Sequence, residues 1–175
     1  MLYWYIFYVY TGRENSVLRC IQNQFHTDVL NPFIPMLETI HKKSGKYSKE
    51  TTIMFPGYVF METEMNSTLF SRNILSLIRQ NKNIIKILKY GDSDEIAMRE
   101  EEQISLLALC NDNYCIKSSE GIIAGDKIII NKGPLQGRES TIRKIDRHKR
   151  EAIIELEIIG GVRLIKVALE ILEKF

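Results

Sequence analysis

The chain opens with its most apolar stretch, MLYWYIFYVY (residues 1–10). Aromatic and β-branched side chains occupy nearly every position from 4 to 10, which is the composition of a central strand covered on both faces. The stretch lacks a basic leader and ends at Thr11-Gly12, well short of the roughly 20 residues that a membrane span needs. It therefore predicts a buried strand and no membrane association.

Three of the segments that follow predict helices. Residues 14–25 carry apolar side chains at spacings of one, three and four, which form one face of a helix. Residues 67–80 partly share this pattern, and Asn66 or Ser67 has the side chain of an N-cap for that helix. A third helix is expected over residues 99–109.

The segments between these helices are predicted to be extended. Pro32 and Pro35 break any helix, so residues 33–40 are expected to lead into the polar run 41–46, which has the composition of a hairpin tip.

Further strands are expected over residues 51–61 and 84–90. Pro56-Gly57 interrupts the first of them, because proline suits a strand end or a bulge better than the middle of a sheet. The alternation of strands and helices predicts an α+β domain over residues 1–112.

The rest of the chain predicts a linker and a second, all-β domain. Residues 113–122 have the small polar composition of a linker. Only short strands follow, over residues 127–131, 139–145, 152–159 and 162–167. Such closely spaced strands indicate a small β-barrel over residues 123–175.

The composition is that of an ordinary globular protein. The 175 residues are 45% apolar and 26% charged, which argues against disorder. Three cysteines without a secretory signal argue against a disulfide framework and favour the reducing cytoplasm. The net charge is only +2, but from residue 121 onward eleven Lys and Arg face eight Asp and Glu. The end of the chain is therefore its basic part.

Residues for catalysis are scarce. The three histidines lie far apart, and Cys110 and Cys115 have no second pair of cysteines with which to bind zinc. No phosphate-binding glycine loop is present. The sequence therefore predicts that the protein is not an enzyme and has no catalytic residues, no metal and no cofactor.

Three motifs, in their order and spacing, resemble those of the NusG family. They are Trp4-Tyr5 with Gly12 and Glu14 before a helix, the segment FPGYVF (residues 55–60), and GDKIII (residues 125–130) followed by GPLQG (residues 133–137). The last is similar to the start of a KOW motif. The resemblance implies a NusG-type N-terminal sandwich of an antiparallel sheet and helices, a linker and a small KOW β-barrel.

The resemblance also implies a binding surface for RNA polymerase. In this family an aromatic-lined depression on the N-terminal domain docks on the clamp helices of the largest polymerase subunit, and the matching residues here are Tyr8, Tyr58, Phe60 and Tyr90. A second contact would come from Asn66, Ser67 and Thr68 at the start of a helix. Two structural alternatives stay open: Phe60 can belong to the core, and Asn66 to Thr68 can be an ordinary helix cap. Trp4 is assigned to the core.

The densest charge run predicts an RNA contact. Residues 143–150, RKIDRHKR, hold five Lys or Arg against one acid at a turn between two strands. Clustered cations on a loop can neutralise several phosphates at once. The RNA-binding residues are expected to be Arg143, Lys144, Arg147, His148, Lys149 and Arg150, with Lys132, Arg138 and Arg163 as extensions. The alternative is a solvated hairpin tip. No aromatic residue interleaves with the run, so the backbone of a structured RNA is favoured over stacked single strands.

These features together predict a processive antitermination factor that binds polymerase and nascent RNA as a cytoplasmic, bacterial monomer. The sequence departs from the KOW pattern in two places: Ser140 replaces a glycine, and Ile159 precedes Gly160-Gly161 where an aromatic residue and Gly-Arg are common. With its altered KOW loop and dense basic turn, the chain resembles a specialised paralogue of the LoaP or RfaH kind. Two alternatives are a general elongation factor without RNA preference and a stand-alone KOW-type binder of RNA or ribosomes.

Overall fold

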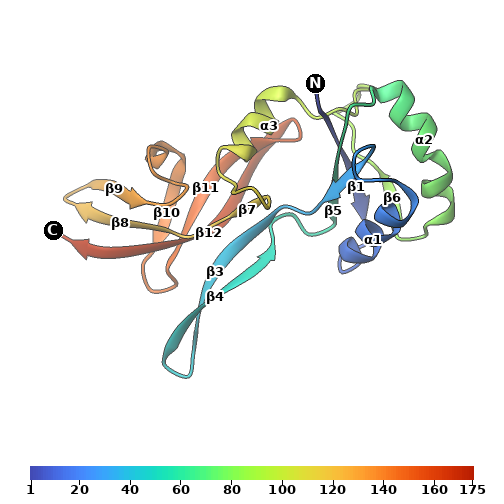
Figure 1. Ribbon diagram of the computed structural model, residues 1–175. Coiled ribbons are helices and arrows are strands. Elements are labelled where there is room, and N and C mark those ends of the chain that lie inside the picture. The colour runs from blue at the N-terminus through green and yellow to red at the C-terminus, as the bar shows by residue number, and fades with distance from the viewer. The chain divides into compact units, whose positions relative to one another are not determined.

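A computed structural model describes all residues, 1–175, and confirms the α+β class. The chain divides into two compact units (Figure 1). The first unit contains Met1–Pro35 and Phe55–Gln103, and the second contains Met36–Met54 and Ile104–Phe175. None of the helices has both the length and the hydrophobicity that crossing a bilayer requires.

The first unit is built on a four-stranded antiparallel sheet. Its strand order is β2-β5-β1-β6, so the predicted first strand lies inside the sheet. The strands are β2 (Asn31–Phe33), β5 (Tyr58–Thr63), β1 (Tyr3–Val9) and β6 (Ile84–Ile87). Pro32 and Pro56 both avoid the interior of the sheet: Pro32 lies on the edge strand β2, and Pro56 precedes β5.

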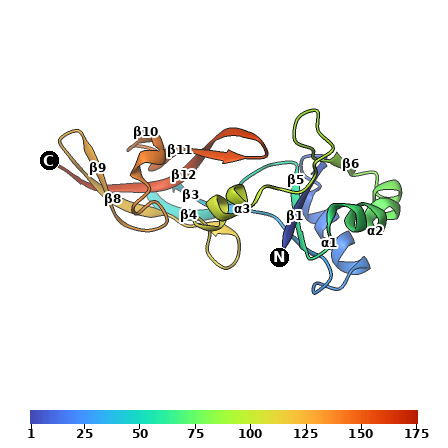
Figure 2. The same ribbon diagram turned by 90° about the horizontal axis from the view of Figure 1, so that it is seen from above.

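Two helices cover one face of this sheet (Figures 1 and 2). They are α1 (Glu14–Gln24) and α2 (Ser67–Gln80), close to the predicted ranges. Tyr5 of β1 stacks on Phe70 of α2 with ring centroids 3.8 Å apart. Alternate residues of a strand point to opposite faces, so Tyr5 and Phe7 pack toward the helices while Trp4, Ile6 and Tyr8 belong to the other face.

Aromatic side chains line that other face. Trp4 meets Phe33 edge to face at 4.9 Å between ring centroids, and its indole Nε1 donates to Glu62 Oε2 at 2.8 Å. The side chain is 1% exposed, which confirms its assignment to the core. A buried Trp is tolerated here because its one polar group has an acceptor.

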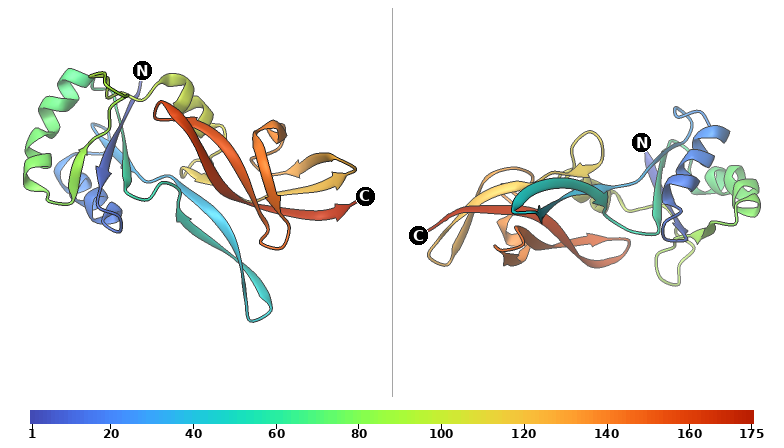
Figure 3. Two further views of the ribbon diagram at one scale, coloured as in Figure 1. Left: turned by 180° about the vertical axis from the view of Figure 1, so that it is seen from behind. Right: turned by 90° about the horizontal axis from the view of Figure 1, so that it is seen from below.

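A long hairpin forms the first part of the second unit. It consists of β3 (Met36–Lys43) and β4 (Lys46–Ile53), with Ser44-Gly45 at the tip inside the predicted polar run. The hairpin is a twisted ribbon whose tip projects away from the other strands of the unit (Figure 3). Glu38 of β3 anchors it, because its carboxylate accepts from the backbone N–H of Ser118 at 2.8 Å.

Five strands form the other sheet of the second unit, in the order β10-β11-β12-β8-β9. They are β8 (Ser119–Ala124), β9 (Lys127–Lys132), β10 (Ile142–Asp146), β11 (Glu151–Ile158) and β12 (Gly161–Lys174). The long β12 pairs antiparallel with β11 and, further along, parallel with β8.

The predicted small β domain is present, but its strands do not close into a barrel, because β10 and β9 are the two edges of the sheet and do not pair. The segment between them contains a 3₁₀ turn, Glu139–Thr141. The Glu139 carboxylate of this turn accepts from the backbone N–H of Ile130 on β9 at 3.2 Å, which ties the turn to that edge strand.

The residues predicted as a linker carry strands. Within 113–122 lie β7 (Cys115–Ile116), which pairs parallel with β3, and the first residues of β8. The helix α3 (Glu100–Leu107) precedes them. The β3–β4 hairpin also groups with the C-terminal residues and not with the remainder of 1–112.

Candidate functional site

Two tyrosines form a paired, partly exposed surface on the first unit. Tyr8 of β1 lies opposite Tyr58 of β5 in the sheet, and their rings meet edge to face with centroids 5.8 Å apart. Tyr8 is 37% exposed and Tyr58 is half-buried. We call these two side chains the tyrosine surface.

Gly57 permits this pairing. Its φ is +87°, and a Cβ there would lie 3.3 Å from Tyr8 Cε2 and 3.2 Å from the carbonyl oxygen of Val9. A left-handed backbone and a close approach both favour glycine. The Pro56-Gly57 pair therefore turns the chain into β5 directly beside the Tyr8 ring.

Glu14 connects this turn to the start of α1. Its buried carboxylate accepts from the N–H of Gly57 at 2.7 Å through Oε1 and from the N–H of Gly12 at 2.9 Å through Oε2. Hydrogen bonds to an ionised acceptor are stronger than neutral ones. Two motifs that are far apart in sequence thus share one carboxylate.

The other two predicted aromatic contacts are buried. Phe60 is fully buried, with its ring centroid 5.5 Å from that of Phe33, which favours the core alternative for this residue. Tyr90 is 7% exposed, its hydroxyl donates to the Glu102 carboxylate, and the Arg99 guanidinium lies 4.6 Å above its ring. Burial first, and then the Glu102 carboxylate, raise the pKa of Tyr90, so the phenol stays protonated as a donor.

The polar turn before α2 is a helix cap. The Asn66 side chain accepts from the backbone N–H of Leu69 at 3.0 Å, which confirms the cap interpretation. Asn66 and Thr68 are exposed and Ser67 is half-buried.

The basic run forms the turn between β10 and β11, as predicted. Asp146 and Glu151 close the hairpin as a pair, and the Asp146 carboxylate accepts from the N–H of Lys149 at 3.0 Å. This hydrogen bond lowers the pKa of Asp146, so the acid stays ionised and fixes the turn. The side chains at the tip that are exposed to solvent are Arg147, His148 and Lys149, and Lys144 is exposed on β10. These four residues are called the basic turn below.

Two arginines of the run are engaged within the protein. Arg143 Nε donates to Glu155 Oε2 at 2.6 Å. Arg150 pairs with Glu170, and its guanidinium lies 3.4 Å from the centroid of the Tyr47 ring. Neither is a freely available cation.

The three predicted extensions lie in different places. Lys132 on β9 lies opposite Glu120 on β8, and Glu120 lies opposite Glu170 on β12. The backbone of Lys132 is therefore two strand spacings, or about 10 Å, from that of Glu170. Arg138 is half-buried and donates to the carbonyl of Pro134 at 3.4 Å. Ala168 of β12 lies opposite Glu151, where the basic turn ends. Arg163 is five residues from Ala168 along the same strand, so its backbone is about 17 Å from that point, at ~3.4 Å per residue. Of the three, Lys132 is the one that the strand order brings toward the basic turn.

Comparison with protein families identifies the chain. Residues 2–107, more than half of the chain, match the model of the NusG family, described as "Transcription termination factor nusG". The chain belongs to the NusG family.

Two relatives of similar length and one solved structure are similar to the chain over nearly all of its residues. The "Transcription termination/antitermination protein NusG" of Helicobacter pylori strain J99 is 23% identical over 183 residues, covering 99% of this chain and 99% of the relative. The protein of the same description from Pasteurella multocida strain Pm70 is 22% identical over 179 residues, covering 98% of this chain and 94% of the relative. A solved structure described as "Domain interaction in Thermotoga maritima NusG" aligns with 98% of this chain and 94% of its own, with a TM-score of 0.48 and 20% identity.

Membership of the NusG family defines the broad class of activity. NusG proteins are transcription factors that bind RNA polymerase, and they are not enzymes. The matched region contains the tyrosine surface, Glu14 and the turn at Gly57. No group of three or more His, Cys, Asp or Glu side chains is arranged to hold a metal ion.

The sequence prediction missed the aromatic partner of the basic run. Tyr47 belongs to the β3–β4 hairpin and is about a hundred positions before Arg150, yet its ring lies under the Arg150 guanidinium. Lys42 of the same hairpin lies with its Nζ 5.5 Å from the centroid of that ring. No local pattern predicts the contact between Tyr47 and Arg150. The lysines of residues 42–49 could have indicated that this hairpin is a second basic segment.

Proposed function

We propose that this NusG-family chain is a transcription elongation and processive antitermination factor that binds RNA polymerase through the tyrosine surface and nascent RNA through the basic turn. The observation that carries the proposal is that the residues available for binding sit in different units: the tyrosines in the first, the unpaired cations in the second. Such a factor would act as a monomer in the bacterial cytoplasm, with the first unit for polymerase and the second unit for RNA.

The proposed binding of polymerase depends on exposed aromatic side chains. Tyrosine offers a large, rigid contact area together with a hydroxyl group, and such anchors dominate the energetics of interfaces. Tyr8 and Tyr58 are reachable from solvent, while Phe60 supports the sheet from within the core. The partner is proposed to be the clamp helices of the largest polymerase subunit, and the polar turn from Asn66 to Thr68 is proposed as a second, separate contact with polymerase. Tyr90, which is buried, would support the first contact from within the domain.

Loss of one anchor should weaken polymerase binding strongly. Tyr8→Ala or Tyr58→Ala is expected to cost about 2 kcal/mol, or about 30-fold in Kd, for core RNA polymerase. Tyr10→Ala is the matched control, because Tyr10 is 58% exposed and lies just beyond β1. Microscale thermophoresis of the labelled full-length protein gives the Kd. Equal affinities for wild type and both anchor variants would contradict the proposed binding of polymerase.

The proposed binding of RNA depends on the cations of the basic turn that form no ion pair. Arg147, Lys149 and Lys144 are exposed and form no ion pair, so they can meet phosphates without first breaking an internal contact. A hairpin tip bearing several cations can follow the backbone of a structured RNA. An RNA preference of its own would make the chain a specialised paralogue of the LoaP or RfaH kind.

Charge reversal tests the proposed binding of RNA. Arg147→Glu with Lys149→Glu should abolish binding to a fluorescein-labelled leader RNA with a stem–loop, measured by anisotropy. Lys127→Glu is the control, because Lys127 is an exposed cation at the turn between β8 and β9. If the double variant binds the RNA as tightly as wild type, the basic turn is only a solvated hairpin tip. Polymerase binding without any RNA binding would make the protein a general elongation factor.

A further inference from the structure

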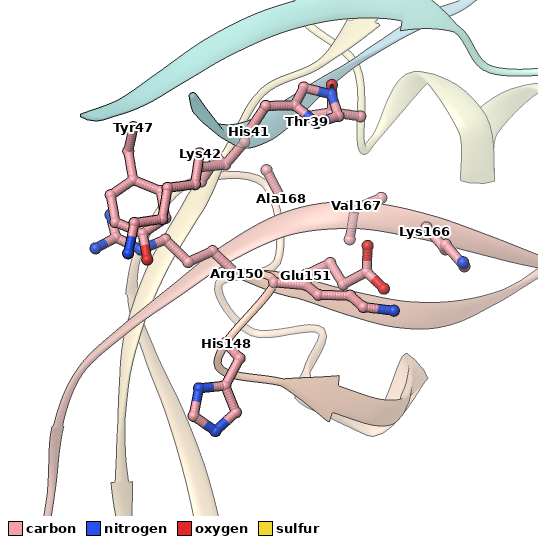
Figure 4. Close-up of a pocket in the computed structure, with 12 residues that line it drawn as sticks. Thr39, His41, Lys42, Tyr47, His148, Arg150, Glu151, Lys166, Val167 and Ala168 are labelled. Carbon is pink, nitrogen blue, oxygen red and sulfur yellow. Dashed lines mark hydrogen bonds between the residues drawn. The ribbon is translucent and has the colours of Figure 1, made fainter. Parts of the chain in front are cut away.

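A pocket of about 350 Å³ lies between the β3–β4 hairpin and the strands that carry the basic run (Figure 4). All of its lining residues belong to the second unit. Its charged and aromatic lining includes Lys42 and Tyr47 from the hairpin, Lys149 and Arg150 from the β10–β11 turn, Glu151 from β11 and Lys166 from β12. Four cations thus face one carboxylate.

Three of these cations lack a carboxylate partner. Arg150 pairs with Glu170, whereas Lys42, Lys149 and Lys166 are exposed and form no ion pair. Exposed cations around a hollow attract negatively charged ligands. The lining of this pocket therefore favours an anion.

Arg150 and Tyr47 form a fixed wall of the pocket. Arg150 has a left-handed backbone with φ of 53°, a conformation that costs a non-glycine residue about 1 kcal/mol. Its guanidinium is held there by Glu170 and lies 3.4 Å from the Tyr47 ring centroid. Figure 4 shows Tyr47 and Lys42 of the hairpin against Arg150. Glu170 takes one guanidinium donor of Arg150, and the remaining donors, held in place over the Tyr47 ring, can still meet a phosphate.

A second hollow of about 700 Å³ lies on the other side of this wall. It shares Tyr47, His148 and Arg150 with the first pocket and adds Arg147 of the basic turn. It also contains Asp146 and Glu170, whose carboxylates are engaged by the Lys149 N–H and by Arg150. The two hollows therefore adjoin at Tyr47, His148 and Arg150, and the second reaches the basic turn. We call the two adjoining hollows the trough. Two adjoining hollows offer more than one place for a phosphate, which suits a polymer better than one small anion.

We propose that this trough, formed by the β3–β4 hairpin together with the β10–β11 turn, binds the phosphodiester backbone of RNA, with Lys42 and Lys166 contacting phosphates and Tyr47 positioning Arg150. The proposal rests on the RNA binding proposed above and extends it to a hairpin that sequence assigned to the other domain.

The test compares full-length variants for binding to the labelled leader RNA across a series of salt concentrations. Lys42→Gln with Lys166→Gln should weaken binding and reduce the slope of log K against log salt by about 0.7 to 0.9 for each lost phosphate contact. Lys127→Gln with Lys174→Gln, two exposed lysines elsewhere in the second unit, should leave the slope unchanged apart from a small general effect of charge.

Tyr47 separates a positioning role from a merely structural one. Tyr47→Phe keeps the ring beneath Arg150 and should retain the affinity for RNA. Tyr47→Leu removes the ring and should weaken that affinity, because Arg150 then loses the contact that positions it. Circular dichroism of both variants checks that the fold is intact. Equal RNA affinities for the two folded variants would overturn the positioning role.

The outcomes separate this inference from the proposed function. If the variants of the basic turn lose RNA binding while the Lys42 and Lys166 variant keeps the wild-type slope, the trough is not an RNA site and the proposed function stands. Such a result would leave an acidic protein as the partner of this surface. Displacement of the RNA by inorganic phosphate at constant ionic strength would also overturn the proposal, because it indicates a site for a small anion. If wild type binds no RNA at all, both fail.

Discussion

Replacing Glu14 with alanine removes the carboxylate that joins the turn before β5 to the start of α1. Gly57 is buried, so its N–H would lose its acceptor without access to water, at a cost of about 1 to 3 kcal/mol. Gly12 is exposed, so its N–H would bond to water instead, and the loss there is about 1 kcal/mol. We therefore expect Glu14→Ala to lower the free energy of unfolding by about 2 to 4 kcal/mol.

Urea denaturation followed by tryptophan fluorescence measures this loss. Trp4 is the single tryptophan and is buried in the same unit as Glu14, so its emission reports the unfolding of that unit. Glu64→Ala is the matched control, because Glu64 is exposed. Glu14→Gln should fall between wild type and Glu14→Ala, since the amide keeps one acceptor oxygen. A loss below about 0.5 kcal/mol for Glu14→Ala would refute the reasoning, because surface substitutions have effects of that size.

Two further predictions concern the second unit. Burial alone would raise the pKa of Glu38, but the Ser118 N–H and the neighbouring lysine lower it below its ordinary value near 4.5. Glu38→Gln should therefore lower the melting temperature at neutral pH. The difference from wild type in thermal melts should disappear as the pH falls through the folded pKa of Glu38. Gly133 has φ of +100°, and a Cβ there would lie 2.7 Å from the carbonyl oxygen of Ser118. Gly133→Ala should cost more than about 2 kcal/mol, against about 1 kcal/mol for Gly137→Ala, where φ is +75° and no atom is within 4 Å; equal losses in urea would contradict this close approach.

The local elements could be predicted because local chemistry decides them. The helices at residues 14–25 and 67–80 follow from the spacing of apolar residues, and Asn66 caps the second as its side chain predicts. The basic turn follows from a charge run between two alternating strands.

The features that the sequence could not reveal depend on distant contacts. The small polar residues of 113–122 have the composition of a linker, but β12 and β3 supply partners that turn parts of this stretch into strands. The sheet stays open because its edge strands β9 and β10 do not pair with each other, which no local pattern shows. The contact between Tyr47 and Arg150 joins two hairpins and has no signature in either one.

Affinity for stalled elongation complexes tests the central claim most directly. The labelled full-length protein would be titrated against two complexes of RNA polymerase that differ only in whether the emerged transcript carries the leader stem–loop. We predict binding to both complexes, with tighter binding to the one that carries the stem–loop and a difference that shrinks as salt rises. Absence of binding to either complex would contradict the polymerase half of the account, and equal affinities at low salt would contradict the RNA half.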